Sequence, residues 1–299
     1  DPYERDDGLH PNNQIKNSKK TLSYNEWLNK LGYDGPNPWN DWANSAEGEN
    51  GEILSGWRLR NSNKPARIPE KHSETAFMTN RAMEFIEESK DKPWFLHLSY
   101  IKPHWPYMAP APYHNMYSAN EFYPVHRNDT ERNNDHPVYK AFMENSISKT
   151  FSKDEVRNTV LSGYMGLIKQ IDDNLGRLFK FLEDAGHMED TMIVFTSDHG
   201  DYQGDHWLGE KELFHEQSVR VPMIIYDPSE HANKTRGTKE KRFIEAIDLL
   251  PTFLDAVESP VSKHRLEGNS LMPVIKGEDV ENWKDFVFSE IDYSFNEAR

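Results

Sequence analysis

The stretch Thr191-Met-Ile-Val-Phe-Thr-Ser-Asp-His-Gly200 decides the predicted fold class. Residues 191–196 are apolar or β-branched, which is typical of a short buried strand. A polar turn containing a glycine follows at once. In open α/β sheets, ligand-binding groups lie just beyond the C-terminal ends of the strands. The stretch therefore predicts a strand that leads directly into a binding loop.

Helical and strand-like patterns alternate on both sides of this stretch. Apolar residues recur every three or four positions over 73–90, where Ser73 is a candidate N-cap, and over 155–186, so both segments are predicted to be amphipathic helices. We therefore predict an α/β fold with a largely parallel sheet flanked by helices. The other predicted elements are short helices at 24–31 and 248–257 and strands at 93–101, 219–226 and 285–289.

Composition excludes several classes of function. The 299 residues include 35 Lys and Arg against 50 Asp and Glu, a formal net charge of −15. This excess of acid argues against nucleic acid and anionic membranes as partners, because both would be repelled. No apolar run approaches the roughly 20 residues that span a bilayer, and no signal segment opens the chain, so the compartment stays open. The absence of cysteine excludes disulfides and cysteine nucleophiles from these residues.

Turn-forming residues are concentrated before residue 70, in stretches such as Gly32-Tyr-Asp-Gly-Pro-Asn-Pro-Trp39. Such a segment could not bury enough apolar surface to fold alone. We therefore expect residues 1–70 to be a loop-rich insertion that packs on the core. Residues 71–299 are expected to form a partial α/β core.

Asp198 and His199 are candidate metal ligands, because a carboxylate oxygen and an imidazole nitrogen at a strand end can both coordinate a cation. An aspartate in this position also often caps the next turn, so this spacing alone leaves both interpretations open. Lys211 follows in the same polar stretch. A lysine beside a metal would neutralise an anionic substrate oxygen, although a single lysine is more often simply solvated.

A second candidate loop, Lys102-Pro-His-Trp-Pro-Tyr107, comes directly after the predicted strand 93–101. Its two prolines restrict the backbone on both sides of His104. A cation, an imidazole and aromatic rings in one rigid loop suit anion binding and protonation of a leaving group. A histidine judged alone would more often be structural.

Taken together, these segments resemble the formylglycine-dependent sulfatases and the related phosphonate monoester hydrolases of the alkaline-phosphatase superfamily. The resemblance covers most of residues 65–275. It is carried by Arg67-Ile-Pro69, by the Lys102-Pro-His-Trp-Pro106 loop, by the helix ending in Leu-Gly-Arg-Leu178, by Ser197-Asp-His-Gly200, by Gly204-Asp-His206, by Lys211, by Arg220-Val-Pro222 and by Ile247-Asp-Leu-Leu-Pro-Thr252.

The resemblance implies a hydrolase of small anionic sulfate, phosphonate or phosphate esters. It implies that Asp198 and His199 bind a divalent metal, for which Ca²⁺, Mn²⁺, Mg²⁺ and Zn²⁺ all remain candidates. It also implies that Lys211 and His104 contact the sulfuryl or phosphoryl oxygens and that His104 helps the leaving group to depart. Lys102 is expected to bind substrate beside them. A homo-oligomer is compatible with all of this.

One departure from the family concerns the nucleophile, a formylglycine made from the first residue of a Cys/Ser-x-Pro-x-Arg motif. The nearest match here, Asn63-Lys-Pro-Ala-Arg67, cannot form it. We therefore expect the formylglycine in a missing N-terminal segment, with the family's N-terminal strands and C-terminal subdomain also missing. The chain would then be the central part of a longer enzyme and inactive alone. The alternative is a catalytically silent module on the same fold that binds an anion or a sulfated glycan.

Overall fold

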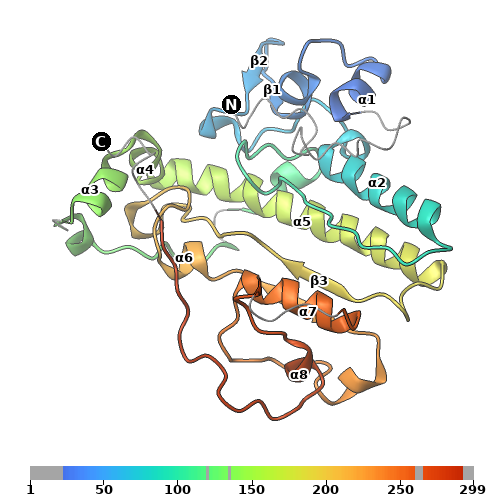
Figure 1. Cartoon of the computed structure of the whole chain (residues 1–299). Helices are drawn as coiled ribbons and strands as arrows, with labels where there is room; N and C mark the ends of the chain where they lie inside the picture. Colours follow the sequence, from blue (N-terminus) through green and yellow to red (C-terminus); the bar gives the residue numbers. More distant parts are fainter. Residues whose placement is uncertain (1–22, 119–120, 134–135, 260–264, 292–299) are drawn as a thin grey trace. The chain divides into compact units, whose positions relative to one another are not determined.

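The computed structural model describes residues 23–118, 121–133, 136–259 and 265–291 (Figure 1). They form two compact units. Unit 1 comprises the described residues of Asp1–Leu182 and Gln203–Gly209, and unit 2 those of Glu183–Tyr202 and Glu210–Arg299. These units do not coincide with the expected segments 1–70 and 71–299, which remain a prediction. Residues 1–22 of the expected insertion lie outside the described residues.

Helices dominate unit 1, whereas unit 2 contains short helices and one strand pair joined by irregular chain. Unit 1 contains α1 (Tyr24–Lys30), β1 (Ser45–Glu47), β2 (Ile53–Ser55), α2 (Glu74–Ser89), α3 (Pro137–Glu144), α4 (Ser146–Phe151) and nearly all of α5 (Asp154–Asp184). Unit 2 contains β3 (Ile193–Thr196), α6 (Glu216–Val219), β4 (Met223–Tyr226), α7 (Leu249–Ala256) and α8 (Met272–Ile275).

The predicted helices are confirmed, with small differences at their ends. Ser73 is the N-cap of α2, since its side chain accepts a hydrogen bond from the Ala76 N–H at 3.2 Å. The long helix α5 runs for 31 residues and stops just before Gly186, whose φ of +75° is favourable only for glycine. No helix in the described parts of the chain is both long enough and apolar enough to cross a bilayer.

Within the described residues the sheets are two antiparallel pairs, β1 with β2 and β3 with β4, so the largely parallel sheet expected from the sequence is not seen there. The predicted strands 191–196 and 219–226 are confirmed in part, as β3 and β4. They are shorter than expected, since β3 begins at Ile193 and β4 begins only at Met223, after the helix α6 (Glu216–Val219).

The strand predictions for 93–101 and 285–289 are wrong, because neither segment joins a described sheet. Residues 93–100 are extended and alternate between exposed and half-buried positions, with Phe95 69% exposed. Phe286 and Phe288 are 70% and 71% exposed. An apolar run forms a strand only where another strand lies beside it to pair with it. The local sequence pattern does not show whether such a strand is present.

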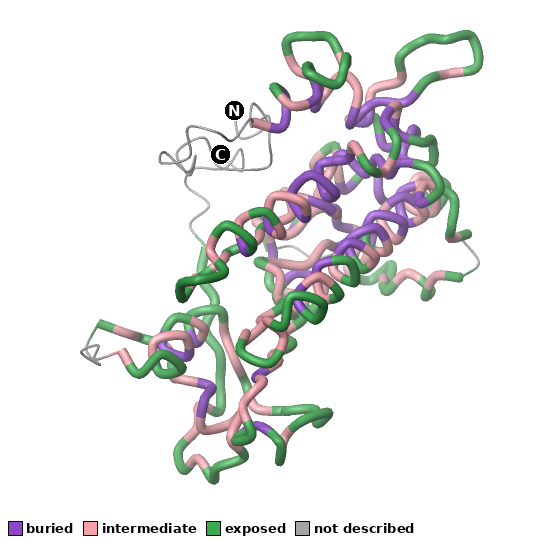
Figure 2. The backbone as a smooth tube through the Cα atoms, turned by 90° about the vertical axis from the view of Figure 1, so that its right-hand side faces the viewer, coloured by how far each residue is buried: buried purple, intermediate pink, exposed green. Residues whose placement is uncertain are grey.

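The core of unit 1 forms where the N-terminal segment packs against α2. Trp39 and Tyr24 are at most 2% exposed and join Phe77 of α2 in one apolar cluster. Beside α2 lies α5 (Figure 1), and Gln170 Nε2 donates to Ser73 Oγ at 2.6 Å across the two helices. Figure 2 shows buried positions along both long helices. The interior is therefore a helix pair covered by irregular chain.

Two glycines let α5 approach the loops of unit 1 at backbone distance. A Cβ placed on Gly166 would lie 2.1 Å from the Tyr113 carbonyl oxygen, and one on Gly163 would lie 2.4 Å from that of Ser62. Distances this short do not occur between a Cβ atom and a carbonyl oxygen. These loops can therefore pack on α5 only where the helix has no side chain.

Gly166→Ala is expected to destabilise the chain by about 1–3 kcal/mol, the usual cost of forcing a methyl group into a packed site. Gly176 is the matched control, because it lies on the same helix with nothing within 4 Å of its Cβ position. Gly176→Ala should instead gain up to about 1 kcal/mol from helix propensity. Urea unfolding of both variants measures the two effects. Equal stability of the two variants would contradict the close approach at Gly166.

Candidate active site

The loop that carries His104 belongs to unit 1 and is fixed by local hydrogen bonds. The His104 N–H donates to the Ile101 carbonyl at 3.0 Å, and His104 Nδ1 lies 2.6 Å from the Trp105 carbonyl oxygen. A carbonyl can only accept, so Nδ1 carries the proton in this pair. In the neutral ring the lone pair is then on Nε2, the nitrogen that can exchange a proton with another group.

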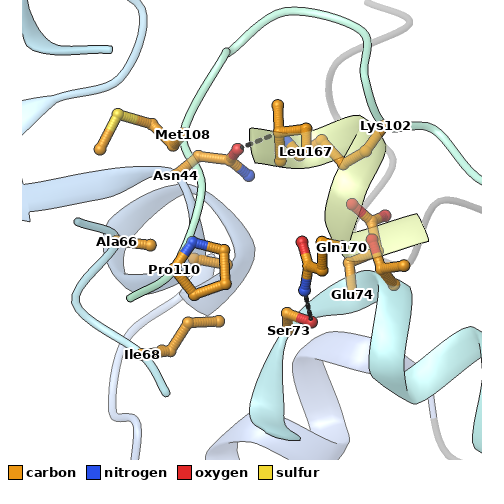
Figure 3. Close-up of a pocket in the computed structure, with 12 residues that line it drawn as sticks. Asn44, Ala66, Ile68, Ser73, Glu74, Lys102, Met108, Pro110, Leu167 and Gln170 are labelled. Carbon is orange, nitrogen blue, oxygen red and sulfur yellow. Dashed lines mark hydrogen bonds between the residues drawn. The ribbon is translucent and has the colours of Figure 1, made fainter. Parts of the chain in front are cut away.

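Lys102 opens the same loop, and its side chain points into the protein. It is only 7% exposed, and Nζ donates to Asn44 Oδ1 at 2.7 Å and to the Pro106 carbonyl at 2.5 Å. Burial lowers the pKa of Lys102 to about 8, against an opposing attraction from Glu74. Figure 3 shows Lys102, Asn44 and Glu74 among the residues that line a pocket. The volume of this cavity is about 10 Å³, about the size that one water molecule needs.

Asp198 and His199 follow β3 in unit 2, as the sequence predicts. The Asp198 side chain is 85% exposed, and its Oδ2 lies 3.6 Å from His199 Nε2. The backbone carbonyl of Gly200 lies 2.7 Å from His199 Nδ1, which makes Nδ1 the donor and leaves the lone pair on Nε2. A carboxylate oxygen and an imidazole lone pair are therefore held close together at the surface of this turn.

The turn after His199 is attached to the segment that carries Lys211. The Gly200 N–H donates to the Ser218 carbonyl at 2.7 Å, and a Cβ on Gly200 would lie 1.9 Å from the Gln217 carbonyl oxygen. The Tyr202 N–H donates to the Glu210 carbonyl at 2.8 Å. Unit 2 thus ties the Asp198–His199 turn to the chain on both sides of Lys211, and only glycine fits at residue 200.

Acidic side chains flank Lys211 on both sides in the sequence. Glu210 and Glu212 share a side-chain hydrogen bond, and burial, followed by repulsion from Glu212, raises the pKa of Glu210 to about 7. The Lys211 ammonium opposes this shift. The local charge around Lys211 therefore changes near neutral pH, which the sequence analysis did not anticipate.

The donor set fits a divalent cation only in part. Asp198 and His199 offer two ligands of suitable type. Over residues 23–118, 121–133, 136–259 and 265–291, no group of three or more His, Cys, Asp or Glu side chains is arranged to hold a metal ion. Asp198 and His199 can therefore fill two positions of a metal site but do not complete one.

The predicted site residues are divided between the units. Asp198, His199 and Lys211 belong to unit 2, whereas Lys102 and His104 belong to unit 1. The buried residues around Lys102, among them the polar Asn44 and Glu74, cannot be read from the sequence, because they come from segments far away in the chain. Glu210 and Glu212 could have been noticed, since both are adjacent to Lys211.

The fold resembles that of phosphonate monoester hydrolases of known structure. Residues 2–259 match the family profile described as "Sulfatase". Because this match covers most of the chain, the chain belongs to the sulfatase family.

Individual relatives agree with this assignment. The chain is 35% identical over 245 residues to the multifunctional alkaline phosphatase superfamily protein PehA of Trinickia caryophylli, covering 78% of this chain and 47% of PehA. It is 30% identical over 262 residues to an arylsulfatase of Clostridium perfringens, covering 86% and 53%. The phosphonate monoester hydrolase structure from Silicibacter pomeroyi superposes with a TM-score of 0.76 at 29% identity, covering 87% and 51%. The chain thus spans about half the length of these relatives.

The carboxyl pair beside Lys211 predicts a pH dependence of stability. The folded-state pKa of Glu210, about 7, lies above its ordinary value of 4.5. Its proton therefore contributes stability that is complete below pH 4.5 and is lost as pH rises through 7. Because Glu210 is partly exposed, the loss should be of the order of 1 kcal/mol.

Urea unfolding at pH 4.5 and at pH 8 should show wild type losing stability relative to Glu210→Gln, which cannot ionise. Glu230→Gln, a change at an exposed glutamate of unit 2, controls for the lost charge. If the free energies of unfolding of wild type and Glu210→Gln changed in parallel with pH, the raised pKa of Glu210 would be ruled out.

Proposed function

We propose that the chain is the central portion of a metal-dependent hydrolase that cleaves small anionic sulfate, phosphonate or phosphate esters. The observation that carries this proposal is the match of residues 2–259 to the sulfatase family. The substrate class is supported by the relatives, whose names include an arylsulfatase and a phosphonate monoester hydrolase. The proposed fold of the intact protein includes the parallel sheet that the family resemblance implies.

In this proposal Asp198 and His199 hold the divalent cation, together with ligands from outside the described residues. This proposed ligand role is supported by the exposed turn, in which Asp198 Oδ2 and His199 Nε2 lie 3.6 Å apart. When bound, the cation would stabilise negative charge on the oxygens of the ester.

His104 and Lys211 are proposed to act on the substrate directly. A protonated His104 ring can donate from Nε2 to the departing oxygen, because Nδ1 is already engaged with the Trp105 carbonyl. The ammonium of Lys211 would balance charge on the sulfuryl or phosphoryl oxygens. The nucleophile, a formylglycine, would come from a segment outside these 299 residues, which contain no cysteine.

Metal binding by the turn can be measured in a protein that includes the formylglycine-bearing segment, because Asp198 and His199 alone do not complete a site among the described residues. Calorimetric titration with Mn²⁺ and with Ca²⁺ should give binding to wild type that is lost in Asp198→Ala and in His199→Ala. Asp190→Ala is the control, because this aspartate of unit 2 is 73% exposed and stands apart from the turn in sequence. Identical titrations of wild type and Asp198→Ala would contradict the ligand assignment.

The catalytic roles are testable in a protein that includes the formylglycine-bearing segment. His104→Ala and Lys211→Ala are each expected to lower kcat/KM for p-nitrophenyl sulfate and for an aryl phosphonate monoester by about 10²–10⁴. The exposed Lys64→Ala should retain wild-type kinetics. Values within a few-fold of wild type for both site variants would remove the proposed roles. No turnover of either ester by the unsubstituted protein would instead count against the hydrolase itself.

A further inference from the structure

Lys102 connects the two ends of the loop that carries His104. The loop begins at Lys102 and ends at Pro106, with His104 in the middle, and Lys102 Nζ donates to the Pro106 carbonyl at 2.5 Å. The same carbonyl accepts the Met108 N–H at 2.9 Å. The lysine side chain therefore closes the loop on itself and holds it to the segment that follows.

The second acceptor of Lys102 is itself fixed. Asn44 is 1% exposed, and its side-chain Nδ2 donates to the Trp39 carbonyl at 3.0 Å. The backbone carbonyl of Asn44 accepts the Gly56 N–H at 2.9 Å. Asn44 Oδ1, which lies 2.7 Å from Lys102 Nζ, is thus a rigid point beside β1 (Figure 3). Through it, the His104 loop is anchored to a distant part of unit 1.

The charge of Lys102 is compensated inside the protein. Glu74 is 5% exposed, attracts Lys102 electrostatically and accepts a hydrogen bond from Trp39 Nε1 at 3.1 Å. A buried ammonium is tolerated when oxygen acceptors and an opposite charge surround it. A substrate anion would have to displace these groups to reach Nζ, and the cavity beside them has room for about one water molecule.

We propose that Lys102 is a positioning residue, which sets the conformation of the His104 loop through Asn44 and Pro106 and does not itself contact the substrate. This inference rests on the proposed function, because it takes His104 as the group that meets the ester. It revises the role of Lys102 expected from the sequence. The short contact between His104 Nδ1 and the Trp105 carbonyl then depends on Lys102. The side chains of Lys102 and His104 need not touch for this.

The tautomer of the His104 ring tests this dependence without any turnover. Ring ¹⁵N NMR of the 299-residue chain, assigned with His104→Gln, should show Nδ1 protonated in wild type. In Lys102→Met/Glu74→Gln, which removes both buried charges together, that signature should be lost. Lys102→Arg, which keeps the charge and the donors, should retain the signature, and Lys64→Met should leave it intact. A folded double variant with the wild-type His104 signals would overturn the inference.

A second measurement needs no variant and decides the question if the double variant does not fold. Inorganic sulfate is titrated into the wild-type chain while the Nζ signals of Lys102 and Lys211 are followed. We expect no shift at Lys102 at sulfate concentrations that shift Lys211. A sulfate-dependent shift at Lys102 Nζ as large as that at Lys211 would mean direct contact with the anion and would overturn the positioning role.

Failure of the proposed function gives a different result. If sulfate shifts neither His104 nor Lys211 in wild type, the anion-binding roles fail. The tautomer comparison still tests the link between Lys102 and His104, because it depends only on the protein. Loss of the Nδ1–H signature in the double variant would then support the positioning link without an anion site.

Discussion

Backbone contact between α5 and the loops of unit 1 is the constraint on which the rest of that unit depends. Gly163 and Gly166 leave the helix without side chains where the carbonyls of Ser62 and Tyr113 approach it. The Tyr107 carbonyl would lie 2.8 Å from a Cβ on Gly163, so the segment just after the His104 loop rests on the same helix. A rigid helix of 31 residues thereby becomes the support for chain that has little regular structure of its own.

The elements that could be predicted are those specified by local sequence. The helix α5 repeats its apolar positions over many turns, and Ser73 can cap α2 by itself, so both were predictable from residue spacing. The segment 93–101 was not, because its apolar residues are compatible with a strand whether or not another strand lies beside it. Strand pairing joins residues that are distant in the sequence. The local sequence pattern therefore predicts neither the antiparallel register of β3 and β4 nor the division into two units.

The candidate site likewise has one part that local sequence specifies and another that only folding brings together. The turn at Asp198 and His199 follows from a strand and a glycine that are adjacent in sequence. The expectation that Lys102 binds substrate depends only on its neighbours in the sequence. Its interior partners, Asn44 and Glu74, come from segments well before it in the sequence. Only the folded chain brings these groups together, and they account for the burial of its ammonium group.

The extended segment 93–101 also carries an expectation for the behaviour of the chain in solution. It is rich in aromatic and aliphatic residues, alternates between exposed and half-buried positions and belongs to neither sheet of the described chain. Backbone of this kind is a template for adding a strand from another molecule, and its composition is that of aggregation-prone segments. The isolated chain should therefore self-associate as its concentration rises. A single lysine in place of Phe95, which is 69% exposed, would oppose this association by adding a charge to the segment.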